Sequence, residues 1–200
     1  PGLLKTLVET GEVKAAPQSV EDNVDANWSP DWKKYGTFDD TFYAAPMLAN
    51  LKGYVWYSPA KFKEWGVEVP KTWDELLTLT KTIQEKTGAA PWCAGFESGG
   101  ASGWPGTDWV EDLMLRTQTP EVYDGWINNS VKFNDPRVIE AIEEYGWFAK
   151  NDAYVDGGAK AVATVSFKDS PKGLFGSPPK CYMHRQASFI TNFFPDGKQD

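Results

Sequence analysis

The sequence predicts an α/β fold in which helices alternate with short strands. Three observations support this class. Segments with helical spacing of apolar residues alternate with short β-rich runs, Gly- and Pro-bearing loops separate them, and the chain has no internal repeat. This order is unlike that of a β-sandwich or a helix bundle. Because ligands of such folds bind at loops beyond the strand ends, a functional site is expected in one of these loops.

The secondary-structure signals in the first third of the chain differ in strength. Residues 1–35 are expected to be helical but show no strong period, and from Gly36 the chain is expected to be extended. Residues 53–57 form a β-rich run that Ser58 and Pro59 stop, which predicts a strand. A short helix is predicted over 60–65, ending at Gly66.

The middle of the chain carries clearer signals. Thr72 and Glu75 form a capping box, which predicts a helix from Thr72 to Gly88. A strand is predicted over 91–96, followed by a Gly/Ser-rich loop over 97–103. Trp104 and Pro105 then begin a helix that runs to about residue 116.

The last third predicts one long helix and several short elements. Asn134 or Asp135 caps a helix with Pro136 in its first turn. A short helix is predicted over 166–175 and a strand over 181–183, with a turn near residue 186. The apolar stripe expected on the long helix consists of Val138, Ile139, Ile142, Tyr145 and Ala149.

Composition excludes several classes of protein. The chain is 41% hydrophobic and 24% charged, values of a folded globular protein. Its net charge of −8 would repel nucleic acid and anionic membrane surfaces, and no run approaches the roughly 18 apolar residues of a membrane helix. Ten Trp, eight Tyr and eleven Phe exceed what a core requires, so some rings are expected to face a ligand.

Metal and nucleophile chemistry is not indicated. The single histidine, His184, and two distant cysteines give no zinc-ligand spacing, and the Gly-rich loop lacks the ending of a phosphate-binding loop. Asn151, Asp152 and Asp156 fit helix termination and a turn better than a calcium loop. We therefore expect no metal ion and no cofactor.

Glu97 is the most informative acidic residue. It ends an extended run beside flexible glycines, with Trp92, Phe96 and Trp104 nearby in sequence. Aromatic planes beside a carboxylate suit a sugar, because the apolar faces of a sugar stack on rings while its hydroxyls bond to acceptors. The residues leave open the alternative of a surface loop above packed aromatics. They also leave open whether Cys93 and Cys181 are free thiols or a disulfide.

Several runs of residues carry a family resemblance. Tyr43 to Pro46, Gly53 to Ser58, and Val69-Pro70-Lys71-Thr72-Trp73-Asp74-Glu75-Leu76 together resemble the extracellular solute-binding proteins of bacterial carbohydrate ABC importers, the maltose-binding-protein-like family. The segment from Met183 to Phe189 resembles the strand-to-helix turn where this family often places a stacking aromatic. The run around Trp104 resembles members that bind α-glucosides.

The resemblance implies a periplasmic-binding-protein-like, two-lobed Venus-flytrap fold, of which this chain is an internal fragment. Residues 1–45 would be the tail of the first lobe, residues 46–57 the crossing strand region, and residues 58–200 the second lobe, incomplete at its C-terminal side. The start of the first lobe and the final helices would be missing.

The resemblance also implies a function without catalysis. The protein would bind a sugar or oligosaccharide as a monomer and deliver it to the membrane permease of an ABC importer, in the periplasm or anchored by lipid outside the cell. An oxidising compartment would pair Cys93 with Cys181. The residues implied to bind the sugar are Glu97, Trp104 and Phe189, with Trp92 and Arg185.

A glycoside hydrolase is the alternative function. Such an enzyme needs two carboxylates across the sugar, and Glu97 with Asp108 or Asp112 would be the candidates. Asp108 and Asp112 are, however, ordinary acids of a helix's first turns, where they favour the helix dipole without a further role.

Overall fold

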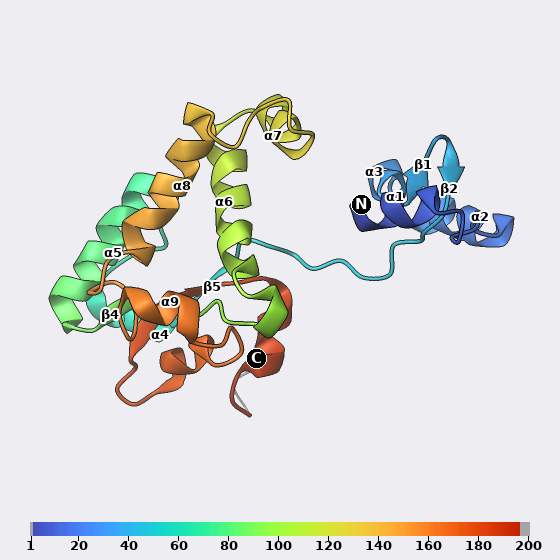
Figure 1. The fold of residues 1–200 in the computed structure, drawn as a ribbon. Coiled ribbons are helices and arrows are strands. Elements are labelled where there is room, and N and C mark those ends of the chain that lie inside the picture. Colours follow the sequence, from blue (N-terminus) through green and yellow to red (C-terminus); the bar gives the residue numbers. More distant parts are fainter. Residues whose placement is uncertain (1, 197–200) are drawn as a thin grey trace. The chain divides into compact units, whose positions relative to one another are not determined.

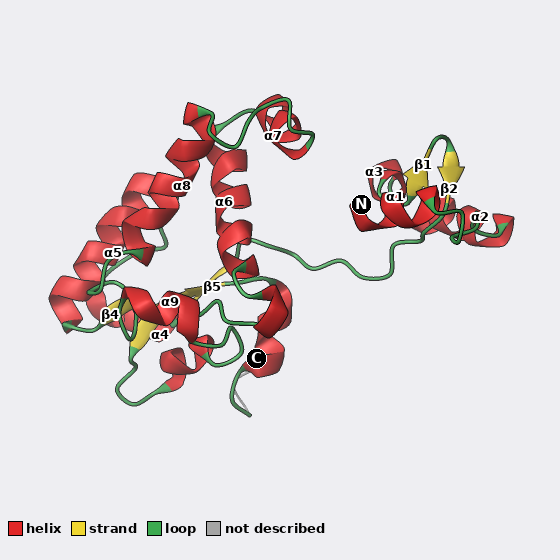
Figure 2. Cartoon of the chain, in the orientation of Figure 1, coloured by secondary structure: helices red, strands yellow, loops and turns green. Residues whose placement is uncertain are grey.

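The computed structural model describes residues 2–196, and the chain divides into two compact units, Pro1–Asn50 and Leu51–Asp200 (Figure 1). Residues 197–200 of the expected second lobe lie outside the described residues. Helices dominate both units, and the strands are short (Figure 2). Within the described residues, we find no helix whose length and apolar content would let it cross a bilayer.

The first unit is a set of three helices and one small hairpin. The hairpin turns at Asp39 and Asp40, which both have positive φ, and Val24 and Phe42 are the buried apolar side chains of this unit. The extended stretch predicted from Gly36 thus pairs only briefly. The elements are α1 (Gly2–Glu9), α2 (Gln18–Asn27), α3 (Pro30–Lys34), β1 (Thr37–Phe38) and β2 (Thr41–Phe42).

The second unit wraps helices around a three-stranded mixed sheet. The strand order is β3-β5-β4, with β5 antiparallel to β3 and parallel to β4. The unit also contains three 3₁₀ turns: Gly99–Ala101, Ser170–Phe175, and Ser188–Phe193, which follows the last strand. Its strands and α-helices are β3 (Val55–Tyr57), α4 (Pro59–Trp65), α5 (Trp73–Thr87), β4 (Ala90–Trp92), α6 (Trp104–Thr117), α7 (Pro120–Ile127), α8 (Pro136–Ala149), α9 (Ala159–Thr164) and β5 (Cys181–Arg185).

The core of the second unit lies between this sheet and α5, α6 and α8. Helices α6 and α8 pack against each other, and close-packed burial of their facing sides excludes water from the middle of the unit. Its most deeply buried side chains include Ile83, Leu113, Met114, Val138, Phe148 and Met183.

The predicted capping box begins α5. Thr72 Oγ1 accepts a hydrogen bond from the Glu75 amide at 3.2 Å. The Glu75 carboxylate accepts from the amide of Lys71 at 2.6 Å, one residue before the cap. Gly88 ends the helix at φ +66°, a left-handed conformation that glycine adopts without a Cβ penalty. The helix prediction for this segment is confirmed.

Other elements differ from the predictions. The strand predicted over 91–96 ends at Trp92. The Cys93 amide still bonds to Met183 of β5, but the Phe96 amide bonds to Val162 of α9. Only Ser170–Phe175 of the helix predicted over 166–175 is helical, as a 3₁₀ turn. Ile139, expected in the buried stripe of α8, is 42% exposed. Helices α7 and α9 were not predicted.

A disulfide joins Cys93 to Cys181, as the family resemblance implied. Both cysteines are buried, their Cα atoms are 5.3 Å apart, and the bond links the residue after β4 to the first residue of β5. Gly173 packs directly on the bond, since a Cβ at this position would overlap the Cys181 sulfur. The site therefore requires glycine.

Candidate functional site

Four aromatic rings form a cluster at one end of the second unit: Trp104, Phe167, Phe189 and Phe193, hereafter the aromatic cluster. The Trp104 ring centroid lies 5.3 Å from that of Phe167 and 5.8 Å from that of Phe189. Phe167 in turn lies 5.5 Å from Phe193. All four side chains are only half-buried, so the cluster presents apolar ring surface to solvent.

The backbone of Glu97 is bonded to the aromatic cluster. Its amide donates to Val165 and its carbonyl accepts from the amide of Phe167 at 3.1 Å. One carboxylate oxygen of Glu97 accepts from the Gly99 amide at 2.6 Å, which fixes the start of the Gly/Ser loop. The structure thus brings Glu97, Trp104 and Phe189 together through Phe167, which contacts both other rings.

Two lysines lie over the rings of the aromatic cluster. Lys52 Nζ is 5.2 Å from the Trp104 ring centroid and pairs with the Asp108 carboxylate. Lys168 Nζ lies 5.8 and 5.6 Å from the centroids of Phe167 and Phe193. Sequence reasoning missed Lys52, Phe167, Lys168 and Phe193, since no local pattern signals contacts that depend on the tertiary fold.

Trp92 does not belong to this site, and its assignment as a ligand-binding residue is wrong. Its side chain is 2% exposed, its indole donates to Thr80 Oγ1 at 3.2 Å, and it packs on Trp109 and Phe148. A ring so deeply buried has no surface to offer a sugar. Trp92 is a core residue at the end of β4.

Arg185 is likewise buried, with 4% of its side chain exposed. It donates to the Asp108 carbonyl oxygen at 3.0 Å, pairs with the Asp112 carboxylate at 3.2 Å, and lies over the Trp109 ring. Burial lowers the pKa of the guanidinium, and Asp112 partly opposes that shift. These contacts fix the end of β5 to the first half of α6. Arg185 therefore positions the helix that carries Trp104.

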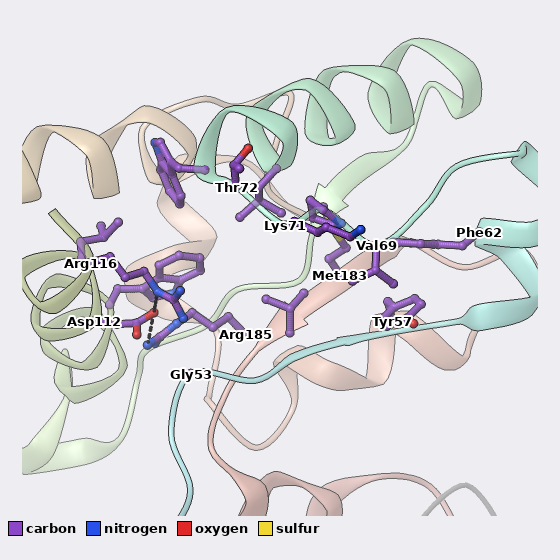
Figure 3. Close-up of a pocket in the computed structure, with 16 residues that line it drawn as sticks. Gly53, Tyr57, Phe62, Val69, Lys71, Thr72, Asp112, Arg116, Met183 and Arg185 are labelled. Carbon is purple, nitrogen blue, oxygen red and sulfur yellow. Dashed lines mark ion pairs between the residues drawn. The ribbon is translucent and has the colours of Figure 1, made fainter.

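A separate pocket of about 200 Å³ lies between β3, the start of α5 and α6 (Figure 3). Asp112 closes one end, where it pairs with both Arg185 and Arg116. Tyr57, Phe62, Val69 and Met183 contribute apolar walls. The rings of the aromatic cluster do not line this pocket, so the two features are distinct.

His184 is a structural residue. Its side chain is buried, and Nδ1 donates to the carbonyl oxygen of Cys93 at 2.8 Å. Burial lowers the pKa of its imidazole to about 4, against a smaller raising effect of that hydrogen bond. Asp152 accepts a hydrogen bond from the Ala159 amide at 2.8 Å, in the turn expected from the sequence. The described residues contain no group of acids, His or Cys arranged for a metal ion.

The chain matches the family model described as bacterial extracellular solute-binding protein, over residues 3–171. It belongs to this family. The resemblance drawn from the sequence is thereby confirmed, and so is the α/β solute-binding fold class.

Two curated relatives of this solute-binding protein are close enough to align along nearly the whole chain. The alpha-glucosides-binding periplasmic protein AglE of Rhizobium meliloti is 54% identical over 99% of the chain. The osmoprotective compounds-binding protein GgtB of Synechocystis sp. is 40% identical over 97% of it. The chain spans 44% and 45% of the lengths of these two relatives.

Solved structures support the fold. A chitin oligosaccharide binding protein superposes with a TM-score of 0.76 at 19% identity, covering 98% of this chain and 46% of that one. The bacterial solute receptor AcbH, described as having an exclusive substrate preference for β-D-galactopyranose, superposes with a TM-score of 0.72 at 22% identity, covering 98% of this chain and 47% of that one.

The hydrolase alternative gains no support. The curated relatives at 54% and 40% identity are named as binding proteins. Asp108 and Asp112, its proposed partners for Glu97, are each engaged by a cation: Lys52 for the first, Arg185 for the second. Both carboxylates are thus held in ion pairs at α6.

Proposed function

We propose that the full-length protein binds a neutral oligosaccharide, an α-glucoside, on the aromatic cluster and releases it chemically unchanged. The observation that carries this proposal is the contact between Trp104 and Phe189, two half-exposed rings from segments 85 residues apart, at 5.8 Å. The name of the relative at 54% identity, an alpha-glucosides-binding periplasmic protein, supports this class of ligand.

The chemistry of the cluster suits a pyranose. The C–H faces of the sugar would stack on the rings, an arrangement that removes apolar surface of both partners from water. The Glu97 carboxylate uses one oxygen on the Gly99 amide, and its remaining acceptor capacity is available for a hydroxyl group. Phe189 takes the place where a Trp is common in the family, which leaves a smaller ring for stacking.

The fold assignment completes the proposal. Residues 1–45 would be the tail of a first lobe, residues 46–57 a crossing region, and residues 58–200 most of a second lobe. The ligand would lie between the lobes, and the loaded protein would act as a monomer that delivers its sugar to the permease of an ABC importer. This places the protein in the periplasm or at the outer surface, anchored by lipid.

Calorimetric titration of the full-length protein with maltose, trehalose and sucrose tests the function. We expect at least one sugar to bind, and product chromatography to show it unchanged. Trp104→Ala should weaken binding at least tenfold, since ring stacking contributes about 1.4 kcal/mol or more. Trp126→Ala, which removes a half-buried ring on α7, is the matched control and should bind as the wild type does.

Two results would contradict the proposal. Release of monosaccharide at enzymatic turnover would show a hydrolase. Sugar binding that is equally strong in Trp104→Ala and in the wild type would remove the aromatic cluster from the site.

A further inference from the structure

Lys52 and Asp108 form an ion pair directly beside the Trp104 ring. The Lys52 ammonium lies 5.2 Å from the ring centroid, and its side chain is 49% exposed. The Asp108 side chain is only 14% exposed. One partner is thus open to solvent beside the ring, while the other is largely covered by protein.

The main chain holds Lys52 in this place. The Leu51 carbonyl accepts from the Ser188 amide at 2.9 Å, and the Tyr54 carbonyl accepts from the Gln186 amide at 3.0 Å. These two bonds flank Lys52 and tie it to the segment that leads directly into Phe189. Lys52 and Phe189 therefore approach Trp104 from two hydrogen-bonded segments of the main chain.

Helix α6 fixes the position of Asp108. Asp108 follows Trp104 by four residues on α6, a spacing that brings two side chains to the same helix face. The Arg185 guanidinium donates a hydrogen bond to the Asp108 carbonyl oxygen, which fixes this turn of α6. The carboxylate therefore lies on the same helix face as Trp104 and pairs with the lysine that lies over that ring.

We propose that the Lys52–Asp108 ion pair is a polar recognition element that bonds to hydroxyl groups of the sugar stacked on Trp104. The ammonium offers three donors and the carboxylate several acceptor positions, so together they can satisfy adjacent hydroxyls, each of which both donates and accepts. Hydrogen bonds to charged groups are stronger than neutral ones. This inference rests on the proposed function and deepens it by assigning two residues of the same site.

An ion pair that merely fixes the segment around Lys52 would behave differently from one that contacts the ligand. A structural pair would change affinity for every sugar by the same factor. A contacting pair would make affinity depend on particular hydroxyls, and removal of the lysine would abolish that dependence. The comparison of wild type and variant on deoxy sugars separates the two roles.

The experiment uses the full-length protein and the tightest-binding sugar of the maltose, trehalose and sucrose panel, with a set of its monodeoxy analogues. We expect Lys52→Met to weaken binding of the parent sugar about tenfold. For the wild type, at least one deoxy analogue should bind more weakly than the parent sugar. For Lys52→Met, that analogue and the parent sugar should bind equally well. Lys52→Arg, which keeps a charged donor, should recover part of the affinity.

Lys61→Met, which breaks the exposed pair of Lys61 with Glu64 on α4, is the matched control and should bind as the wild type does. Wild-type affinity in Lys52→Met, or an equal loss for the parent and all analogues, would overturn the inference. If Trp104→Ala weakens binding while Lys52→Met does not, only this inference fails. If Trp104→Ala has no effect, the proposed function itself fails. Asp108→Asn provides a second readout should Lys52→Met not fold.

Discussion

His184 links the stability of the second unit to pH. Its pKa in the fold is about 4, below the usual value of 6.5, because the buried imidazole disfavours the charged form. Between these two pH values the unfolded chain binds the proton and the native protein does not. Stability is therefore fully present above about pH 6.5 and is lost as the pH falls towards 4.

We expect this group to remove about 2 kcal/mol of stability between pH 7 and pH 5. His184→Asn keeps a donor for the Cys93 carbonyl and does not titrate, so its urea midpoint should fall less over this interval. The measurement is urea unfolding of both full-length proteins at pH 7 and pH 5. An equal fall in wild type and variant would show that other groups cause the pH dependence.

At the residue scale, sequence alone could not separate Trp92 from Trp104. Both lie within a few residues of the same Gly/Ser loop, but the Trp92 ring packs in the core against Phe148, whereas Trp104 begins a helix at the surface. Which side of a short strand faces inward depends on the partner strand. Glu97 and Trp104 were predictable from the loop that they flank, whereas Phe189 came only from the family resemblance.

At the scale of elements, the N-cap of α5 is an independent contribution to stability. Thr72→Ala removes the acceptor of the Glu75 amide and should cost about 1 kcal/mol. Thr82→Ala on the same helix is the control, because Thr82 Oγ1 bonds only to a carbonyl already within the helix and alanine has the higher helix propensity. Chemical unfolding of both variants checks this. A loss in Thr82→Ala as large as that in Thr72→Ala would contradict the assignment.

The long helices were predictable because they combine end signals with a sustained apolar pattern, whereas α7 and α9 were not. Helices α5, α6 and α8 each combine a cap or an early proline with more than three turns of apolar spacing. Helix α9 spans six residues and begins after Gly158 with no side-chain cap. Helix α7 does have a cap at Thr119, but with eight residues it offers only two turns of pattern. Short helices of this kind depend on tertiary packing.

On the scale of the whole molecule, the disulfide makes the largest single contribution that we predict. It closes a loop with a sequence separation of 88 residues, which in the chain-entropy model stabilises by about 4 kcal/mol. The double variant Cys93→Ala, Cys181→Ala should lower the urea midpoint of the full-length protein accordingly. An unchanged midpoint, or two thiols that react with alkylating agent in unreduced wild type, would contradict this prediction.

The whole-molecule arrangement was predictable only through the family. The alternation of helical and strand patterns predicted the α/β class. The two-lobed fold and the Cys93–Cys181 disulfide were predicted from the family resemblance. The contact between Lys52 and the Trp104 ring could not be predicted from the sequence, because it depends on how residues 51–54 pair with the segment after β5. That pairing joins parts of the chain about 130 residues apart, beyond the reach of any local pattern.

The disulfide also decides what a protease can release. Exposed residues 99–103 and 128–130 both lie inside the loop that the bond closes, so a cut at either place leaves the two pieces covalently joined. Such nicked protein would migrate as a single band in electrophoresis until a reductant is added. Met47 and Leu48, also exposed, lie outside the loop, and a cut there would free a separate fragment at once. The banding pattern with and without reductant would therefore report where the chain is accessible.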